Sequence, residues 1–243
     1  MPLTLLIALQ FLTRLPIRLP GMPSPQQQAR SLLWYPAVGL LLGAALVLLQ
    51  RLLGEAPAAL QAALLLALWV SASGALHLDG LADTADAWVG GLGDRERTLA
   101  IMKDPRSGPM AVVALVLLLL LKFVALLALV ERGEASGLLL APLLGRTALL
   151  ALFFSTPYVR PNGLGRGLAE HLPRPAARTV LLAVALACPL LFGSAGVRAL
   201  AVAVPLFLYL RHCLRARLGG TTGDTAGALL EVLECAVLVA LAL

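Results

Sequence analysis

The stretch from His77 to Pro109 reads HLDGLADTADAWVGGLGDRERTLAIMKDPRSGP and interrupts long apolar runs. It holds five of the six aspartates of the chain, while the runs on either side carry almost no charge. Of the 243 residues, 60% are apolar and 13% are charged, which is more apolar than the core of a soluble domain requires. The stretch is therefore an acidic site set in a membrane protein.

The apolar runs predict helices. They are rich in Leu and Ala and only 5% of residues are aromatic, whereas membrane barrels show short alternating strands with aromatic girdles. We predict an all-α, polytopic transmembrane helical bundle that forms one integral membrane domain over residues 1–243. The seven expected spans are about Trp34–Leu53, Ala58–Leu76, Met110–Val130, Leu138–Phe154, Val180–Phe192, Ala199–Leu210 and Ala226–Leu243.

Two segments depart from the pattern of regular spans. The fifth and sixth spans are short and contain Pro189 and Pro205, so the count falls to six if they form one irregular hairpin. The apolar part of Met1–Leu19 is too short to cross a bilayer comfortably and lacks the features of a signal peptide. We expect an N-terminal interfacial or re-entrant helix there.

The positions of Lys and Arg orient the bundle, because cytoplasmic loops of membrane proteins are enriched in them. In the seven-span topology, three of these basic residues lie on one side of the membrane: Arg51, Arg132 and Arg198. Fourteen lie on the side of the acidic stretch: Arg14, Arg18, Arg30, Arg95, Arg97, Lys103, Arg106, Arg160, Arg166, Arg174, Arg178, Arg211, Arg215 and Arg217. The bias predicts that the active-site loops face the cytoplasm and that the C-terminus lies outside.

The spacing of three aspartates predicts a metal site. In a helix, Asp79, Asp83 and Asp86 stand at i, i+4 and i+7 and share one face. Like charges so close repel one another, and no Lys or Arg lies between His77 and Asp94 to offset them. Carboxylate oxygens favour Mg²⁺ or Mn²⁺ over zinc, and such a site is usual in phosphoryl transfer. The alternative is a solvated acidic helix face.

Glycines and cations follow the aspartates. Gly90 and Gly91 allow a phosphate to approach the backbone closely. The forked guanidinium groups of Arg95, Arg97 and Arg106 suit phosphate oxygens. We predict that these five residues bind substrate, although GGLG alone matches neither the Walker nor the dinucleotide fingerprint.

A second polar cluster, LGGTTGDTAGALLEVLE, runs from Leu218 to Glu234 into the last span. Carboxylates inside an apolar span are costly unless they are paired or bind a metal, and by default they mark function. We predict that Asp224 and Glu231, which share a helix face, bind substrate together with Arg146. In the alternative interpretation, the carboxylates pair with Arg146 or Lys122 and hold the bundle together.

The loop from Thr156 to Arg178 is a third polar region. It contains four residues suited to an anionic substrate, Arg160, Asn162, Arg166 and His171. Arg160 is the substrate-binding candidate among them. A basic cytoplasmic loop without substrate contacts would show the same composition.

The motifs DGLADTADAW, DRERTLAIMKDPRSG and GGTTGDTAGALLEVLE, with FLTRLP near the N-terminus, resemble those of the adenosylcobinamide-GDP ribazoletransferases, or cobalamin synthases. The resemblance extends from Phe11 to about Glu234. It implies an inner-membrane, Mg²⁺-dependent enzyme of late cobalamin (vitamin B12) biosynthesis. Such an enzyme joins adenosylcobinamide-GDP to α-ribazole or its 5′-phosphate, releases GMP, and forms adenosylcobalamin or its 5′-phosphate.

The resemblance also implies roles for residues. Mg²⁺ held by the three clustered aspartates would bridge the donor diphosphate, while Arg95, Lys103 and Arg106 would steady its oxygens. The sequence leaves the general base open among three residues, Asp86, Asp104 and His77.

Two other functions fit parts of the sequence. A CDP-alcohol-type phosphotransferase acting on a lipid has a similar aspartate layout, but its longer motif is absent from this chain. A small-solute or ion transporter would use the charged residues within the spans. The expected partners are the two small-molecule substrates and the lipid bilayer, without nucleic acid. The sequence does not decide whether the protein forms homo-oligomers or associates with other cobalamin-pathway enzymes.

Overall fold

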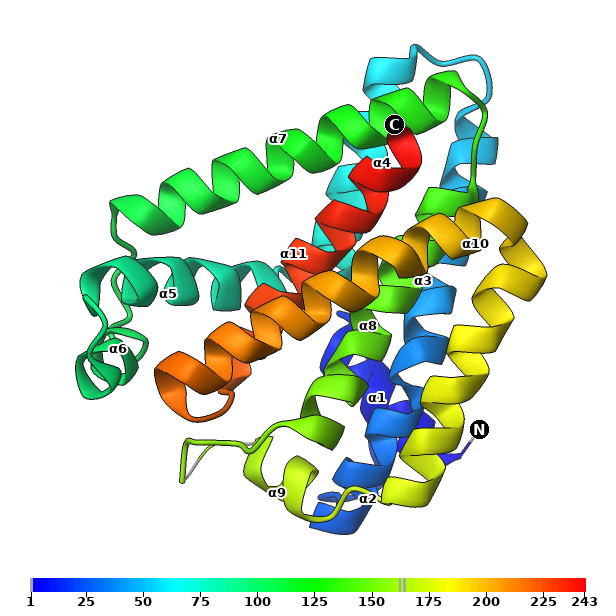
Figure 1. Ribbon diagram of the computed structural model, residues 1–243. Coiled ribbons are helices and arrows are strands. Elements are labelled where there is room, and N and C mark those ends of the chain that lie inside the picture. The colour runs from blue at the N-terminus through cyan, green and yellow to red at the C-terminus, as the bar shows by residue number, and fades with distance from the viewer. Residues whose placement is uncertain (1, 162, 164) are drawn as a thin grey trace.

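A computed structural model of the chain describes residues 2–161, 163 and 165–243, so the predicted anion-binding residue Asn162 lies outside the described residues. In this part of the chain every regular element is helical, apart from one isolated bridge between Tyr158 and Thr221. The predicted all-α fold is confirmed. The helices in Figure 1 are α1 (Leu3–Leu12), α2 (Pro25–Ser31), the 3-10 helix η1 (Leu32–Trp34), α3 (Tyr35–Leu53), α4 (Ala58–Ser73), α5 (Leu76–Gly90), α6 (Arg95–Ile101), α7 (Pro109–Glu131), α8 (Ser136–Ser155), α9 (Gly165–Glu170), α10 (Arg174–Leu218) and α11 (Gly223–Ala242).

Several helices are long and apolar enough to cross a membrane. Five meet this criterion by length and composition: the continuous stretch Pro25–Leu53, α7, α8, α10 and α11. The pair α4 and α5 meets it only when the two are taken together. The short N-terminal helix α1 has ten residues and buries Leu9 and Leu12. The predicted polytopic bundle with an additional short N-terminal helix is therefore confirmed.

The predicted second span, Ala58–Leu76, is broken near its end. α4 stops at Ser73, and both Gly74 and Ala75 have positive φ, at 62° and 56°. α5 then starts at a bend of 87° to α4. The acidic stretch therefore does not continue the span but forms a separate helix that runs beside α7 (Figure 1).

The predicted fifth and sixth spans lie on two arms of one helical hairpin. α10 covers 45 residues, but Gly193 interrupts it with φ 53° and ψ −129°, a conformation that disfavours any side chain. Figure 1 shows α10 turning back on itself, so that both of its ends lie in the lower half of the view. This agrees with the irregular hairpin that the proline residues suggested.

The centre of the bundle is formed by α8 and α11. In each, 78% of the apolar window is buried inside the protein, against 28% in α7 and 11% in α10. The outer helices therefore present their leucines and valines to lipid. The C-terminus lies near the α7–α8 turn, at the end opposite the loop that follows α8 (Figure 1).

Candidate active site

The site begins where α5 crosses α11 at close range. A Cβ added to Gly80 would lie 2.7 Å from the carbonyl oxygen of Asp224, and one added to Gly227 would lie 3.1 Å from that of His77. Glycine at both positions lets the two backbones approach. The crossing brings the DGLAD and GGTTGD motifs together, although they are far apart in the sequence.

A cavity of about 290 Å³ opens at this crossing. Its lining includes six side chains that carry polar groups: Tyr35, His77, Asp79, Tyr158, Arg160 and Asp224. We call it the acidic cavity. Asp79 and Asp224, which belong to separate motifs, therefore face the same space.

Asp83, one turn after Asp79 on α5, is half-buried. It is within electrostatic reach of the carboxylates of Asp79, Asp224 and Asp86, and of the Arg160 guanidinium. Four carboxylates near one guanidinium form an oxygen-rich donor set that suits a divalent cation. Among the described residues, no three acidic, His or Cys side chains are already gathered as metal ligands, so the carboxylates would have to close around an ion.

Asp86 has a partner that the sequence did not predict. Its Oδ2 accepts a hydrogen bond from the Gly108 N–H at 2.5 Å, and its Oδ1 accepts one from the Ala111 N–H at 2.9 Å. These donors belong to the first turn of α7, whose own N-cap residue offers no side-chain cap. Asp86 therefore caps α7 from a neighbouring helix and stabilises the positive end of its dipole.

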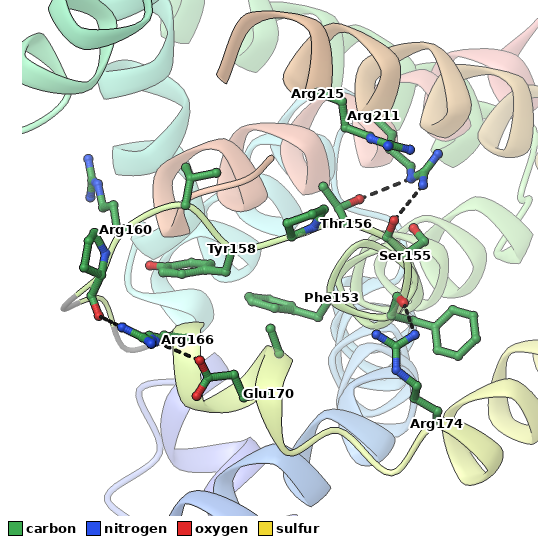
Figure 2. A pocket seen from close by; sticks show the side chains of 15 residues that line it. Phe153, Ser155, Thr156, Tyr158, Arg160, Arg166, Glu170, Arg174, Arg211 and Arg215 are labelled. Carbon is green, nitrogen blue, oxygen red and sulfur yellow. Dashed lines mark hydrogen bonds and ion pairs between the residues drawn. The ribbon is translucent and has the colours of Figure 1, made fainter. Parts of the chain in front are cut away.

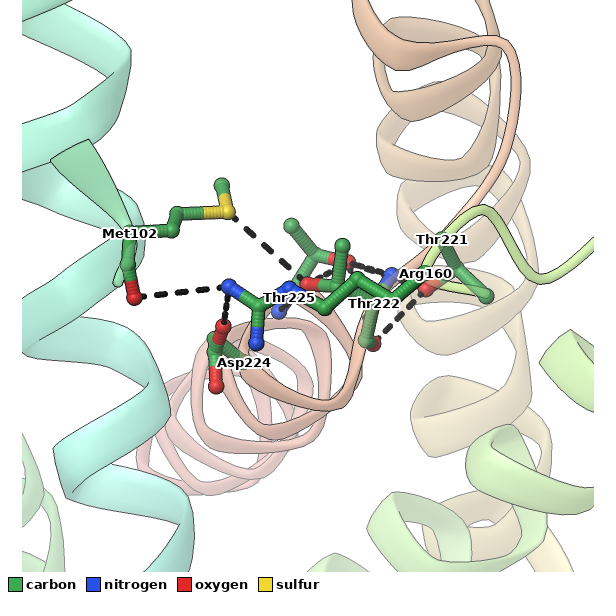
Figure 3. Close-up of polar contacts among 6 residues, drawn as sticks. All are labelled: Met102, Arg160, Thr221, Thr222, Asp224 and Thr225. Carbon is green, nitrogen blue, oxygen red and sulfur yellow. Dashed lines mark hydrogen bonds and ion pairs between the residues drawn. The ribbon is translucent and has the colours of Figure 1, made fainter. Parts of the chain in front are cut away.

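Arg160 connects the loop after α8 to the acidic cavity. Its Nη2 lies 2.7 Å from Asp224 Oδ2 and 3.3 Å from the Met102 carbonyl oxygen (Figure 3). Thr222 caps α11, and the Thr221 N–H donates to the Pro157 carbonyl at 2.8 Å. These bonds hold the loop before Arg160 against the start of α11, and they place the guanidinium beside the carboxylates.

The predicted cations of α6 and the following loop do not line the acidic cavity. Arg95 Nε donates to the Leu218 carbonyl at 2.8 Å and so ties α6 to the end of α10. The side chains of Arg97 and Lys103 are exposed. Arg106 donates to both carboxylate oxygens of Asp104, at 2.9 and 2.7 Å.

Asp104 is a weak candidate for the general base. Hydrogen bonds from the Arg106 side chain and backbone lower the pKa of Asp104 to about 2. A carboxyl group with so low a pKa holds almost no proton at neutral pH. Both carboxylate oxygens of Asp104 also accept hydrogen bonds from Arg106, and the residue does not line the acidic cavity.

Gly90 and Gly91 have a packing role. A Cβ added to Gly91 would overlap the Thr98 hydroxyl, and one added to Gly90 would lie 3.0 Å from the Ile101 side chain. Both glycines allow α6 to fold back onto the end of α5. This contact accounts for them without a bound phosphate.

Arg146 and Glu231, predicted to bind substrate, lie in a buried charge network. Lys122 Nζ donates to Glu231 Oε2 at 2.6 Å and to Glu234 Oε2 at 2.9 Å, and Arg146 pairs with Glu234. None of the four side chains is more than 5% exposed. Two cations and two carboxylates balance in charge and connect α7, α8 and α11. The geometry favours the alternative interpretation, in which these residues hold the bundle together.

His77 is the general-base candidate with the most suitable position. It lines the acidic cavity, is 4% exposed, and its Nδ1 has no hydrogen-bond partner among the described residues. A neutral imidazole with an unpaired nitrogen can accept a proton. Neither Asp86, bound to α7, nor the exposed Asp104 offers this combination.

A second cavity, of about 890 Å³, lies beside the loop that follows α8, and the sequence predicted only part of it. Its cationic lining comprises Arg160, Arg166, Arg174, Arg211 and Arg215 (Figure 2). We call it the basic cavity. The sequence indicated Arg160 and Arg166 for an anionic substrate but did not add Arg174, Arg211 or Arg215, which come from the two ends of α10.

The fold and site define a class of protein: a polytopic membrane protein with an oxygen-rich acidic cavity beside an arginine-rich one, as phosphoryl-transfer chemistry requires. The sequence matches the cobalamin-5-phosphate synthase family over residues 4–242, and the chain belongs to this family. No solved structure matches the chain.

Curated relatives cover almost the whole chain. It is 66% identical over 237 residues to the adenosylcobinamide-GDP ribazoletransferase of Pseudomonas entomophila (strain L48), covering 98% of this chain and 97% of the relative. It is 67% identical over 241 residues to the enzyme of the same name from Stutzerimonas stutzeri (strain A1501), covering 99% and 98%. These relatives support the resemblance drawn from the motifs and give no support to a CDP-alcohol phosphotransferase or a transporter.

Proposed function

We propose that this chain joins adenosylcobinamide-GDP to α-ribazole or its 5′-phosphate, releasing GMP and forming adenosylcobalamin or its 5′-phosphate. The observation that carries the proposal is the family match over residues 4–242, together with relatives of this activity at 64–67% identity. The two adjoining cavities support it, because the reaction brings a diphosphate and an alcohol together.

The reaction is a substitution at phosphorus. A ribose hydroxyl of the acceptor attacks the phosphorus that bears the cobinamide, a new P–O bond forms, and the P–O bond to GMP breaks. GMP departs with the bonding electrons, and the hydroxyl proton passes to a base. His77 is positioned to take this proton, because it lines the acidic cavity and its Nδ1 has no hydrogen-bond partner in the described part of the chain.

We propose that Mg²⁺ is held by Asp79, Asp83 and Asp224. In this set Asp224 replaces Asp86, the third ligand predicted from the sequence. When bound, the ion supplies charge neutralisation to the diphosphate and the departing GMP. Arg160, already paired with Asp224, is close enough to contact the same phosphates. The support is the excess of carboxylates over cations in this region.

The test uses purified protein in liposomes with adenosylcobinamide-GDP, α-ribazole and Mg²⁺. GMP and the corrinoid product are followed by chromatography, with an EDTA control. We expect both products in equal amounts, and none with EDTA. A folded protein that releases no GMP with either acceptor would contradict the proposed reaction, whereas activity that persists in EDTA would contradict only the metal.

We propose further that the protein resides in the cytoplasmic (inner) membrane with both cavities facing the cytoplasm. The support is the distribution of Lys and Arg, fourteen to three, over the two sides of the predicted spans.

A further inference from the structure

A third cavity, of about 530 Å³, lies between four helices: α5, α7, α10 and α11. No charged residue lines it, and it shares no lining residue with the acidic or the basic cavity. Its volume is in the range of about 300–1,000 Å³ that is usual for sites of small molecules. We call it the apolar groove. It is a separate space that the proposed reaction does not use.

The apolar groove opens toward the surroundings of the bundle. Five of its lining side chains are at least 37% exposed: Val89, Met110, Val113, Leu117 and Tyr209. They belong to α5 and to the two outer helices α7 and α10. Water finds few hydrogen-bond partners in such a lining, whereas a hydrocarbon chain leaves no polar group of its own unsatisfied. The groove therefore suits an acyl chain of the surrounding bilayer.

A tryptophan and an arginine lie at one end of the groove, where α5 and α10 end and α7 begins. Trp88 lines the groove, and Cζ of Arg217 lies 5.3 Å from the centre of its ring. Tryptophan is enriched at the level of lipid headgroups, because its ring is apolar and its N–H is polar. This contact places the Arg217 guanidinium beside the groove at the depth where lipid phosphates lie.

Two cations at this end have only neutral partners. Arg217 donates to a hydroxyl and to a carbonyl oxygen, both at 3.1 Å, and Arg95 donates to the Leu218 carbonyl at 2.8 Å. Within the described part of the chain neither arginine forms a salt bridge, although the exposed Asp94 and Glu96 flank Arg95. These bonds fix the guanidinium groups without neutralising them and leave N–H donors for an anion.

One polar atom of the lining also lacks a partner. The Thr84 hydroxyl is buried, lines the groove one turn before Trp88, and has no hydrogen-bond partner among the described residues. Buried hydroxyl groups are normally hydrogen-bonded, and this one can donate to an ester carbonyl. In a glycerophospholipid the ester groups lie between the phosphate and the acyl chains. The order of Arg217, Thr84 and the apolar lining matches that order.

We propose that the apolar groove is a binding site for an anionic phospholipid. One acyl chain lies between α5, α7, α10 and α11, an ester carbonyl accepts a hydrogen bond from Thr84, and the phosphate lies at Arg217 and Arg95. The lipid fills the space beside α5, the helix that carries the clustered aspartates. It is a bound component of the folded protein and takes no part in the chemistry.

Trp88 itself reports such a lipid, because brominated acyl chains quench tryptophan fluorescence at short range. Full-length protein is reconstituted in phosphatidylcholine liposomes with a rising fraction of brominated phosphatidylglycerol or of brominated phosphatidylcholine. The difference between wild type and Trp88→Phe separates the signal of Trp88 from those of Trp34 and Trp69. Half-maximal quenching of Trp88 should need about fivefold less phosphatidylglycerol than phosphatidylcholine, since one interfacial arginine attracts an anionic lipid about this strongly.

Two matched pairs of variants test the two parts of the site. Arg217→Gln removes the charge and keeps a donor, so the preference for phosphatidylglycerol should fall below about twofold. Arg178→Gln, at an exposed arginine of α10 outside the groove, should keep the preference. Val113→Phe narrows the mouth and should weaken quenching by both lipids. Val116→Phe should leave it unchanged, because Val116 is similarly exposed, at 50% against 47%, but does not line the groove.

Several outcomes would overturn the inference. Equal quenching by the two lipids would exclude a phosphate site, and equal effects of Val113→Phe and Val116→Phe would show that no chain enters the groove. Quenching that falls as the protein becomes denser in the bilayer would assign the groove to a second copy of the chain. If Arg217→Gln misfolds, wild-type protein gives the same test, because the preference must weaken as salt is raised. A preference that salt leaves unchanged would refute the role of the arginines.

Discussion

At the scale of single residues, the three aspartates of α5 have different surroundings despite their regular spacing. Asp79 faces the acidic cavity, Asp83 lies among carboxylates, and Asp86 is bound to the N-terminus of α7. The i, i+4, i+7 pattern predicts a shared helix face but not what packs against it. Substitutions of these aspartates should therefore differ in their effects, some on activity and others on stability.

Asp83→Asn should lower GMP release by at least about tenfold and raise the Mg²⁺ concentration needed, because a ligand charge is lost. Asp86→Ala should instead lower the free energy of unfolding by about 1 kcal/mol, as for loss of a helix cap. Rates across a Mg²⁺ series and thermal unfolding in detergent measure the two effects. An Asp83→Asn protein with unchanged rates at every Mg²⁺ concentration would exclude Asp83 from the site.

His77→Ala should lower kcat by about a hundredfold or more with little change in KM, because general-base catalysis contributes about 10²–10⁴. Asp104→Asn should change kcat by less than about threefold, since Asp104 does not line the acidic cavity and its carboxylate is paired with Arg106. Steady-state kinetics of both variants decide whether His77 or Asp104 is the general base. The opposite ranking would assign the base to Asp104.

At the scale of elements, buried charges join three of the helices. The carboxylates of α11 meet Lys122 of α7 and Arg146 of α8, and the Lys122 ammonium also lies 4.9 Å from the centre of the Trp69 ring. Removal of one partner from such a network leaves a charge uncompensated, which costs more than the network itself contributes.

Lys122→Met should therefore lower the free energy of unfolding by about 3–5 kcal/mol. The double variant Lys122→Met, Glu231→Gln should recover much of this loss, because the remaining pair of Arg146 and Glu234 is neutral overall. Leu118→Met, one turn earlier and also buried, is the control and should cost less than about 1.5 kcal/mol. Unfolding by detergent titration measures all three. A double variant no more stable than the single one would contradict the charge argument.

Gly193→Ala should destabilise the α10 hairpin by about 1–3 kcal/mol. No atom lies within 4 Å of the added Cβ, so the cost comes from the backbone conformation alone. Gly21→Ala, where the Cβ also meets open space and φ is not positive, should have little effect. Thermal unfolding of both variants is the measurement, and equal stabilities would show that Gly193 is not required for the turn.

At the scale of the whole molecule, the orientation can be measured. A periplasm-active reporter such as alkaline phosphatase should be active when fused after Leu243 and inactive when inserted between Gly219 and Gly220, in the turn before α11. These positions lie at the two ends of α11. The reverse pattern would contradict the assignment of the basic loops to the cytoplasm.

Sequence periodicity and composition predicted the helices and the acidic centre, because both depend on local patterns. They did not predict the bend at Gly74 and Ala75, which ends a run that stays apolar. They also missed the capping role of Asp86 and the contribution of α10 to the basic cavity, since each joins residues from distant segments. What sequence reasoning lacked was the set of tertiary contacts.

The buried charge network also has a consequence for the order of synthesis. Ribosomes make α7 and α8 first, so Lys122 and Arg146 enter the bilayer region before Glu231 and Glu234 exist. Until the last helix arrives, each nascent intermediate carries unneutralised cations among apolar helices. Insertion of α11 thus neutralises both cations, and a chain truncated before it would present two unmatched charges to the cell's membrane quality control.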